Sequence, residues 1–370
     1  MKSVIVLGGT SIFGGRIAAG LAESKDIHVK IASRHPEKAT TFAKQIGAEL
    51  VQCDASDAKS LESIVKDADL LIHTAGPFQG NDYRVAQTCI DNGVHYLDIS
   101  DGREFVCGIT GLDSAPKKRG VVVGSGASSV PTITNAMIEE ISGEFTEIDT
   151  IQIALSPGNQ NPRGASTIGS ILTYLARPIQ VWENNNWQST SGWSDRRRLE
   201  FPDRVGKRDV FRCEVPDMDL FPTKWNARTL RFHAGVELNI INRSLSAIGW
   251  ARQYVPMPWL PELAGIMTSL SRLLFPLGSK NGALSIWITG SCHNTKRIER
   301  RIAIVTDDDG PATPSAPGIL LARKILIDNS MPTGAYPCDG FLSFAEVTQH
   351  LKKHGVWHVK GDDSGWYDAG

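Results

Sequence analysis

The sequence predicts two domains: an α/β domain built on a doubly wound parallel sheet, and an inserted α+β domain with a mostly antiparallel sheet. Three observations support this. Short apolar segments alternate with helical patterns through the first 130 residues, which is typical of parallel sheets covered by helices. The first apolar segment, residues 4–7, runs directly into a glycine-rich turn. From about residue 147 onward, strand-like alternation dominates, and 283–291 with 296–306 reads as an antiparallel pair.

Composition narrows the class of protein. The chain has 370 residues, enough for about two domains. Hydrophobic residues make up 41% and charged residues 21%, as in ordinary globular proteins. A net charge of −1 gives no electrostatic reason to expect a nucleic acid as partner. Six cysteines without a C-x-x-C pair indicate reduced thiols in a cytoplasmic protein rather than disulfides or a zinc site.

The first domain is predicted to occupy residues 1–130. A late segment, 310–330, and the C-terminal tail are expected to pack back on it. Apolar runs and helical patterns alternate in order along the domain, and the late segment contains one further helix. The strands are expected at 3–8, 27–33, 48–53, 69–74, 94–98 and 120–124, and the helices at 14–24, 36–46, 58–67, 81–92, 104–118 and 315–328.

The turn after the first strand predicts a dinucleotide site of the Rossmann type. Gly8 permits a tight turn, and Gly14 permits close packing of the following helix on the strand. The backbone N–H groups at the helix start would then face a pyrophosphate. Ser11 stands where the middle glycine of this fingerprint is usual. The alternative interpretation is a glycine-rich turn without a ligand. The predicted cofactor-binding residues of this turn are Gly8, Thr10, Ser11, Ile12, Phe13 and Gly14.

The end of the second strand favours NADP(H) over NAD(H). NAD-binding units place a carboxylate there, which would repel a 2′-phosphate. This chain has Ser33 and Arg34, followed by Lys38 one turn later. An arginine can pair with the phosphate and stack on the adenine. The alternative is that Arg34 and Lys38 form a solvated helix start.

Two later turns extend the predicted cofactor site. Asp54 follows the third strand, where its carboxylate can accept a hydrogen bond from the adenine amino group. The turn after the fourth strand lies at the carboxyl edge of the sheet, where ligands bind in this architecture. It is predicted to line the ribose–nicotinamide half of the cofactor through Ala75, Gly76, Pro77 and Phe78.

The fifth and sixth strand ends supply candidates for the substrate site and for catalysis. Asp98, Asp101 and Arg103 follow the fifth strand, together with Glu104, and Ser128 lies in a small-residue loop after the sixth. Asp101 could instead cap the next helix, and Arg103 could pair with a surface carboxylate. The hydroxyls near Ser128 could simply cap a helix at 131–142.

The second domain is predicted to span residues 131–309. Arg163 is a candidate clamp for a substrate carboxylate, or alternatively a surface arginine. Besides the antiparallel pair, elements are expected as strands at 147–155, 179–183, 187–193, 208–215 and 229–238, and as a helix at 164–176.

The segment 244–278 is the most apolar stretch, but charged residues interrupt it, so no transmembrane span is predicted. It reads as two short helices, 244–254 and 260–275. They would form a lid or a dimer surface, while peripheral membrane contact through 244–278 stays open. The tail after the late helix is expected to be loosely ordered in part. His350, His354 and His358 recur every four residues, but Gly355 would end that helix, so no metal site is expected.

The chain resembles the saccharopine dehydrogenase-like, saccharopine reductase-related oxidoreductases. The resemblance covers most of the chain and is strongest through residue 131. It rests on sequence runs that include the glycine-rich turn, the end of the second strand and the late segment: Gly8–Gly14, Ala32–Pro36, Ala75–Phe78, Gly93–Asp98, the loop 124–131, and Gly310–Leu321.

This resemblance implies an NADP-binding Rossmann domain, a late helix packed back on it, and an inserted domain that often carries a dimer contact. The implied activity is hydride transfer at a carbon–nitrogen bond of a small amino-acid-like substrate. Saccharopine-forming members carry an aspartate where this chain has Ser128, which indicates a different substrate.

Two other functions place different demands on the sequence. A short-chain-dehydrogenase mechanism needs a Tyr-x-x-x-Lys pair, and no tyrosine here is followed by lysine four positions later. The remaining alternative is a non-catalytic NADP-binding sensor or a membrane-associated scaffold, since a well-formed fold does not guarantee chemistry.

Overall fold

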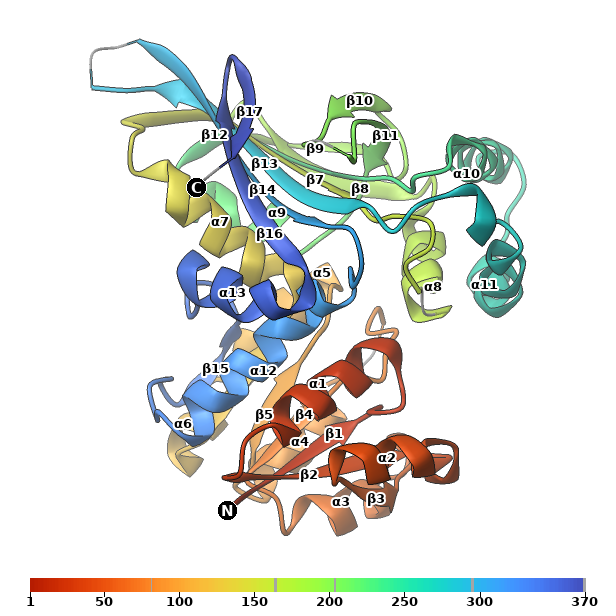
Figure 1. Cartoon of the computed structure of the whole chain (residues 1–370), viewed down its shortest axis with the longest axis vertical. Helices are drawn as coiled ribbons and strands as arrows, with labels where there is room; N and C mark the ends of the chain where they lie inside the picture. Colours follow the sequence, from red (N-terminus) through yellow and green to blue (C-terminus); the bar gives the residue numbers. More distant parts are fainter. Residues whose placement is uncertain (81, 163–164, 203, 294–295, 369–370) are drawn as a thin grey trace. The chain divides into compact units, whose positions relative to one another are not determined.

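The computed structural model describes residues 1–80, 82–162, 165–202, 204–293 and 296–368 (Figure 1). The chain divides into two compact units. The first comprises Met1–Ile133 and Pro311–Leu342, and the second comprises Thr134–Gly310 and Ser343–Gly370. Each unit therefore contains a segment that returns from the C-terminal part of the chain.

The first unit is built on a seven-stranded parallel sheet with the order β15-β6-β5-β4-β1-β2-β3. The order reverses direction between β1 and β4, and this switch point is where ligands bind in such sheets. The strands are β1 (Lys2–Leu7), β2 (Ile27–Ser33), β3 (Glu49–Gln52), β4 (Leu70–His73), β5 (His95–Asp98), β6 (Val122–Ser125) and β15 (Gly334–Pro337).

Helices cover the sheet because its central strands are buried along their length. β1 and β4 read VIVL and LLIH at fully buried positions, as expected for strands covered on both faces. The α-helices are α1 (Ile12–Ala22), α2 (Thr40–Ile46), α3 (Ala58–Val65), α4 (Arg84–Asp91), α5 (Arg103–Gly108), α6 (Ser114–Arg119) and α12 (Ala312–Leu326), with short 3-10 helices at Pro36–Ala39 and Ile109–Leu112 and an irregular turn at Ser129–Ile133.

The late helix α12 packs on α1, as the resemblance implied. The two helices approach closely because each presents a glycine. A Cβ on Gly20 would lie 2.4 Å from Ile319, and one on Gly318 would lie 2.9 Å from Ile17. Residues more than 290 positions apart thereby complete one layer of the first unit.

The second unit is an α+β structure with a ten-stranded sheet. Its main path runs β10-β11-β12-β7-β13-β14-β16-β17, and β8 pairs with both β9 and β12. The strands are β7 (Glu147–Ser156), β8 (Pro178–Glu183), β9 (Asn186–Ser191), β10 (Arg197–Glu200), β11 (Lys207–Arg212), β12 (Ala227–Ala234), β13 (Gly282–Ser291), β14 (Arg297–Thr306), β16 (Val356–Asp362) and β17 (Gly365–Asp368).

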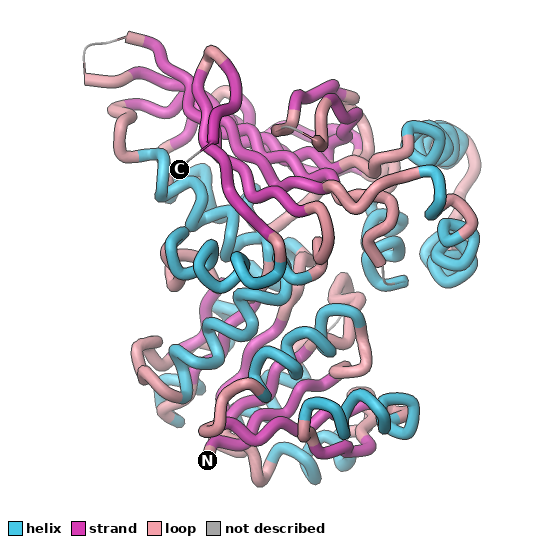
Figure 2. Tube along the Cα trace, viewed as in Figure 1, coloured by secondary structure: helices cyan, strands magenta, loops and turns pink. Residues whose placement is uncertain are grey.

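The long strands β7, β13 and β14 run side by side through this sheet (Figure 2). Only β7 and β12 pair in parallel, and the other described pairings are antiparallel. The predicted fold class is therefore confirmed. The helices of the unit are α7 (Thr134–Ser142), α8 (Ala165–Tyr174), α9 (Asp217–Lys224), α10 (Asn239–Arg252), α11 (Ala264–Arg272) and α13 (Phe344–Leu351), with 3-10 helices at Leu260–Leu263, Phe275–Leu277 and Lys352–His354.

Several element predictions need correction. The helix predicted at 104–118 is broken into α5, a 3-10 turn and α6, because Gly108 and Gly111 interrupt it. The strand predicted at 208–215 ends at Arg212, and the helix α9 follows it. Pro216 is tolerated as the N-cap of α9, where a missing N–H costs nothing.

The C-terminal tail needs the largest correction. It is predicted to pack on the first domain and to be loosely ordered in part. Its first part does belong to the first unit, where β15 pairs with β6. From Ser343 onward the tail belongs to the second unit: β16 pairs antiparallel with β14 over seven residues, and β17 pairs with β16. Trp366 donates its indole N–H to the Glu200 carbonyl at 2.9 Å and packs 5.6 Å from Trp287. The tail is ordered because it extends the sheet at the edge that β14 would otherwise leave open.

Candidate functional site

The glycine-rich turn between β1 and α1 lies against the loop that follows β4. Gly8 has φ 84°, in the left-handed region that favours glycine. A Cβ on Gly8 would lie 2.8 Å from the Ala75 nitrogen, and one on Gly14 would lie 2.4 Å from Thr74 Oγ1. Thr74 in turn donates its hydroxyl to the Leu7 carbonyl at 2.9 Å. The two loops flanking the switch point can therefore meet only because these positions lack a side chain.

The start of α1 offers free donors. Ser11 is the N-cap, and its Oγ accepts from the Gly14 N–H at 3.0 Å. Within the described chain, no acceptor reaches the N–H groups of Ile12 and Phe13, which belong to the first helical turn. Thr10 beside them is exposed. Free amides at the positive end of an 11-residue helix suit a phosphate group, so the residues present fit the pyrophosphate of a dinucleotide.

The residues at the end of β2 lie at the adjacent part of the sheet edge. Ser33 Oγ is buried and has no hydrogen-bond partner among the described residues. Arg34 and Lys38 are exposed. Asp54 Oδ1 accepts from the N–H of Ser56 at 2.9 Å and from its hydroxyl at 2.7 Å. These hydrogen bonds lower the pKa of Asp54, and the nearby charge of Arg34 adds to the effect.

The loop after β4 carries the predicted nicotinamide-side residues Ala75, Gly76, Pro77 and Phe78. The Gly76–Pro77 peptide bond is cis. Phe78 is buried, and its ring lies 4.9 Å from that of His73 and 5.4 Å from that of Phe105. The aromatic rings of His73, Phe78 and Phe105 therefore pack together at this loop.

Asp98 ends β5 and accepts hydrogen bonds from two segments, the loop after β5 and the end of β6. Its side chain is completely buried. Its Oδ1 accepts from the Ser100 N–H at 2.9 Å, the Ser125 hydroxyl at 2.9 Å and the Gly126 N–H at 3.0 Å. Burial raises the pKa of Asp98 to about 6, although these hydrogen bonds act in the opposite direction. The carboxylate thus fixes the strand ends of β5 and β6 to each other.

Two residues beneath this edge were missed by the sequence analysis. His73, at the end of β4, lies 3.3 Å from the Tyr96 hydroxyl through its Nδ1. Burial lowers the pKa of His73 to about 4, so the ring is neutral at pH 7. Burial likewise raises the pKa of Tyr96. A histidine at the end of the otherwise apolar strand β4, and a tyrosine two residues before Asp98 in β5, are the signals that could have identified them.

Three other substrate-site candidates, Asp101, Arg103 and Ser128, follow β5 and β6 at the same edge. Asp101 Oδ1 accepts from the Gln79 side-chain amide at 3.1 Å. Gly102, not Asp101, is the N-cap of α5, so the capping alternative for Asp101 is wrong. Arg103 is the first residue of α5 and is partly buried. Ser128 is buried, and its N–H donates to the Gly126 carbonyl at 2.7 Å. Arg163 lies outside the described residues.

The three histidines do not share one helix. His350 in α13 and His354 in the following 3-10 helix have tilted rings with centroids 5.9 Å apart. His358 lies on β16 and packs edge-on against Phe344 at 5.2 Å. In the part of the chain that the structure describes, no group of three or more His, Cys, Asp or Glu side chains is arranged to hold a metal ion.

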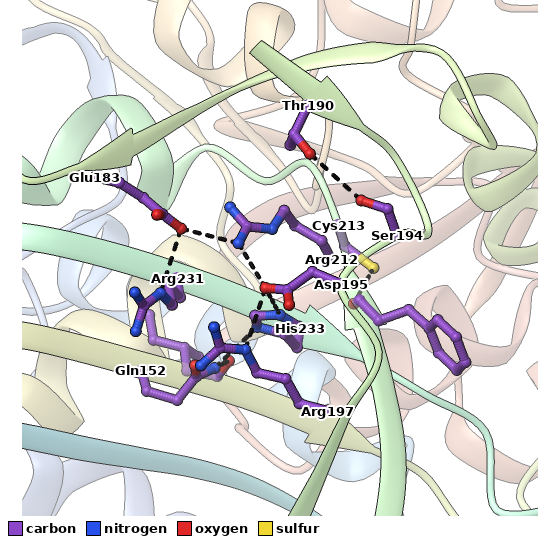
Figure 3. A network of polar contacts seen from close by, with 12 residues as sticks. Gln152, Glu183, Thr190, Ser194, Asp195, Arg197, Arg212, Cys213, Arg231 and His233 are labelled. Atoms are coloured by element: carbon purple, nitrogen blue, oxygen red, sulfur yellow. Dashed lines mark hydrogen bonds and ion pairs between the residues drawn. The ribbon is translucent and has the colours of Figure 1, made fainter. Parts of the chain in front are cut away.

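The second unit contains a separate charge network (Figure 3). Asp195 accepts from Arg212 Nη2 at 2.5 Å and from Arg197 Nε at 3.1 Å, and lies 3.3 Å from His233 Nε2. Glu183 accepts from the same Arg212 Nη2 at 2.9 Å. These side chains come from β8, the turn before β10, and strands β10, β11 and β12. The network therefore joins the β8–β9 hairpin and the turn that follows it to the main path of the sheet.

Comparisons with known proteins agree with this site. Residues 4–124 match the family model described as the saccharopine dehydrogenase NADP binding domain. This match confirms the predicted resemblance and the assignment of NADP to the first unit. The model covers the glycine-rich turn, the end of β2, and the loops after β4 and β5.

Curated relatives match over part of their length. A rat saccharopine dehydrogenase-like oxidoreductase is 25% identical over 115 residues, covering 30% of this chain and 26% of that protein. A trans-acting enoyl reductase of Mycobacterium ulcerans is 25% identical over 186 residues, covering 46% of this chain and 43% of that protein. The matched segments therefore span about a quarter of the first relative and about two fifths of the second.

Among solved structures, apo saccharopine dehydrogenase (L-Glu forming) from Saccharomyces cerevisiae superposes with a TM-score of 0.70. The match covers 98% of this chain and all of that chain at 14% identity. At this identity the likeness establishes the shared fold alone.

Proposed function

We propose that this chain is an NADP-dependent oxidoreductase that transfers a hydride at a carbon–nitrogen bond of a small amino-acid-like substrate. One observation carries the proposal. The free amides of α1, the exposed Arg34 and the polar loops after β4, β5 and β6 all lie at the carboxyl edge of one parallel sheet. In this architecture, that edge is where cofactor and substrate meet.

Each residue then has a proposed role. The amides of Ile12 and Phe13 hold the pyrophosphate, and Arg34 with Lys38 pairs with the 2′-phosphate. The bound NADPH supplies the hydride. Asp98 is a positioning residue, because its buried carboxylate acts through the loops that it holds.

The substrate residues are proposed from their place in the chain and at the sheet edge. Asp101, Arg103 and Ser128 lie on the edge loops, and Arg163 is kept as a candidate clamp for a substrate carboxylate. A serine at 128 suits a neutral hydrogen-bonding group better than an ammonium group. A homodimer is proposed as the default assembly for a protein of this kind.

A second candidate activity is reduction of a carbon–carbon double bond. The match to a mycobacterial trans-acting enoyl reductase extends over 46% of this chain, further than the match to the rat saccharopine dehydrogenase-like protein. Both activities use the same hydride donor and differ in the substrate pocket. Ser128, where saccharopine-forming members carry an acid, is compatible with either.

The first test is a titration with NADPH and NADH, following nicotinamide fluorescence, for the wild type and for Arg34→Ala. We expect the wild type to prefer NADPH and the variant to bind NADPH roughly tenfold more weakly or worse, because a charge-assisted phosphate contact is lost. Arg119→Ala, an exposed arginine at the end of α6, is the control and should bind as the wild type. Equal affinity of wild type and Arg34→Ala for NADPH would remove Arg34 from the site.

The second test is turnover. NADPH oxidation is followed with amino-acid and aldehyde pairs that form imines, and separately with α,β-unsaturated thioesters. Oxidation with imine-forming pairs supports the proposal, and oxidation with the thioesters alone supports the second candidate. Tight NADPH binding without turnover on either class would favour a non-catalytic sensor.

A further inference from the structure

The second unit exposes an unusual concentration of apolar side chains. Of thirteen large hydrophobic side chains that are exposed in the described part of the chain, nine lie between Ile240 and Leu277. This segment contains α10, α11 and the two 3-10 helices beside α11. Scattered exposed hydrophobics are ordinary, but a concentration of this kind marks an interaction surface.

The helices that carry these residues are held firmly on one side. α11 packs on α8, which also contacts the 3-10 helix before α11. Arg252 Nη1, at the end of α10, donates to the carbonyls of Leu172 and Leu175 in α8 and just after it, at 2.8 and 2.9 Å. α8, α10 and α11 lie together at one end of the second sheet (Figure 1). The inner sides of these helices therefore pack against one another and against the rest of the unit. In the described chain, no element covers the apolar residues on their outer sides.

The outer side of α11 presents a continuous apolar stripe. Ile266, Leu270 and the C-cap residue Leu273 follow one another at intervals of four and three residues, which places them on one face of α11. Leu277, the last residue of the 3-10 helix after α11, adds a fourth exposed apolar side chain. These four side chains are 60%, 58%, 75% and 68% exposed. On and beside α10, Trp250 and Tyr254 pack at 5.2 Å and are 64% and 71% exposed. Tryptophan and tyrosine beside a leucine stripe are typical of helices that lie in a bilayer interface.

The hydroxyl groups of these helices suit a lipid surface. α10 and α11 contain five serine and threonine residues, and each donates its hydroxyl to a carbonyl of its own helix three or four residues earlier, at 2.6–3.1 Å. Hydroxyl groups whose hydrogens are already donated within the helix can enter a medium without hydrogen-bond acceptors.

The charge of the segment points to the same occupant. Residues 239–278 contain three arginines and a single acid, Glu262. Arg177 and Arg243 are exposed, and burial followed by the charge of Arg177 lowers the pKa of Arg252. The guanidinium groups of Arg177 and Arg252 therefore lie near each other at this end of the second unit. Basic residues beside an apolar interfacial helix attract anionic lipid headgroups.

We propose that the surface formed by α10, α11 and the adjoining 3-10 turns docks the protein on an anionic phospholipid membrane. Docking is peripheral: no helix among the described residues is long and apolar enough to cross a membrane. Ile266, Leu270, Leu273 and Leu277 enter the outer acyl region, Trp250 and Tyr254 lie at headgroup level, and Arg177 and Arg243 face the phosphates. Such docking does not depend on the proposed oxidoreductase activity.

The test is vesicle flotation of the full chain with phosphatidylcholine vesicles that contain or lack phosphatidylserine. The wild type should float, more strongly with phosphatidylserine. Leu270→Gln/Leu273→Gln should lower vesicle affinity by at least about tenfold per leucine, since each loses a buried apolar side chain. Ile327→Gln/Tyr367→Gln, which alters two exposed apolar residues outside the segment, should float as the wild type. Arg177→Gln/Arg243→Gln should remove the preference for phosphatidylserine.

Sedimentation velocity without lipid provides the opposing outcome. A wild-type dimer that the leucine variant converts to monomers, together with no flotation, would assign the surface to a second copy of the chain and overturn the proposal. Equal flotation of the wild type and the leucine variant would also overturn it. Circular dichroism spectra and urea unfolding curves like those of the wild type show that the variants are folded.

Discussion

At the scale of single residues, two neighbouring glycines in α1, Gly14 and Gly15, have different surroundings and therefore different structural roles. A Cβ on Gly14 would lie 2.5 Å from the Gly8 carbonyl oxygen, a backbone atom that cannot rotate away. A Cβ on Gly15 would meet nothing closer than 3.6 Å. Gly14 is therefore required by the contact between α1 and the turn, whereas Gly15 only lowers helix propensity.

We predict that Gly14→Ala and Gly15→Ala have opposite effects. Gly14→Ala should push α1 away from the turn, weaken NADPH binding at least about tenfold and lower the free energy of unfolding by about 1–3 kcal/mol. Gly15→Ala should keep the affinity and raise the free energy of unfolding by about 0.5–1 kcal/mol. Fluorescence titration and urea unfolding of both variants measure these effects. Two variants with the same affinity would contradict the close-contact role of Gly14.

Asp98 makes a second prediction at this scale, about pH. Burial raises its folded-state pKa to about 6, above the value near 4 of an unfolded chain. Between these values the folded protein binds more protons than the unfolded one, so the contribution of Asp98 to stability falls as pH rises. The amide of an Asp98→Asn variant does not titrate, and its oxygen can still accept from Ser100 and Gly126.

In Asp98→Asn, the fall in stability that Asp98 causes between pH 4 and pH 7 should disappear. The free energy of unfolding of the wild type minus that of Asp98→Asn should fall by on the order of 2 kcal/mol from pH 4 to pH 7. His73 contributes the opposite trend in the same range, since its pKa is lowered to about 4, but it is present in both proteins. Urea unfolding at several pH values gives the difference. Curves that stay parallel from pH 4 to 7 would show that Asp98 does not titrate there.

At the scale of elements, the charge network of Figure 3 joins the β8–β9 hairpin and its following turn to the main sheet. Asp195 has φ 48°, in the left-handed region, and lies in the turn between β9 and β10. The pKa of Asp195 lies well below its usual range: burial alone would raise it, but the Arg212 hydrogen bond and the Arg197 charge prevail. The turn is therefore held by an ionised carboxylate among arginines.

Removing this carboxylate should loosen the hairpin. In Asp195→Ala, the largely buried Arg212 and the fully buried His233 lose an acceptor, so the free energy of unfolding should fall by about 2–3 kcal/mol. The control is Glu62→Ala, which removes an exposed pair with Lys66 at 3.0 Å and should change it by less than about 1 kcal/mol. Chemical denaturation compares the two. Equal small losses would mean that the network contributes little to stability.

At the scale of the whole molecule, the alternating strands and helices form the parallel sheet of the first unit, and the later strands form the mostly antiparallel sheet of the second, as the local patterns predict. Most predicted strand ends in the first unit agree with the structure to within one or two residues, because short apolar runs next to turns have few other structures available. The break in the helix at 104–118, the missed helix α9 and the strand β15 show where local pattern fails: short elements that contain glycine or proline depend on their neighbours.

The candidate site was predictable to the same degree. Gly8 and Gly14 could be identified because their roles follow from local needs: a tight turn and a close approach. The pairing of Arg34 with a phosphate stays a prediction. His73 and Tyr96 could be noticed as polar residues near strand ends, but the contact between them could not be predicted. Their proximity, 3.3 Å between ring nitrogen and hydroxyl, arises only when β4 and β5 pair.

The sequence by itself determined the parallel α/β unit, its glycine-rich turn and its NADP cofactor, because periodicity and glycine placement act over a few residues. Only the tertiary structure decided that Asp98 is buried beneath the loops it holds, that Asp195 lies among arginines from neighbouring strands, and that the tail completes the second sheet. These features depend on which distant segments meet. Burial and strand pairing, which set pKa values and order a tail, arise only from such meetings.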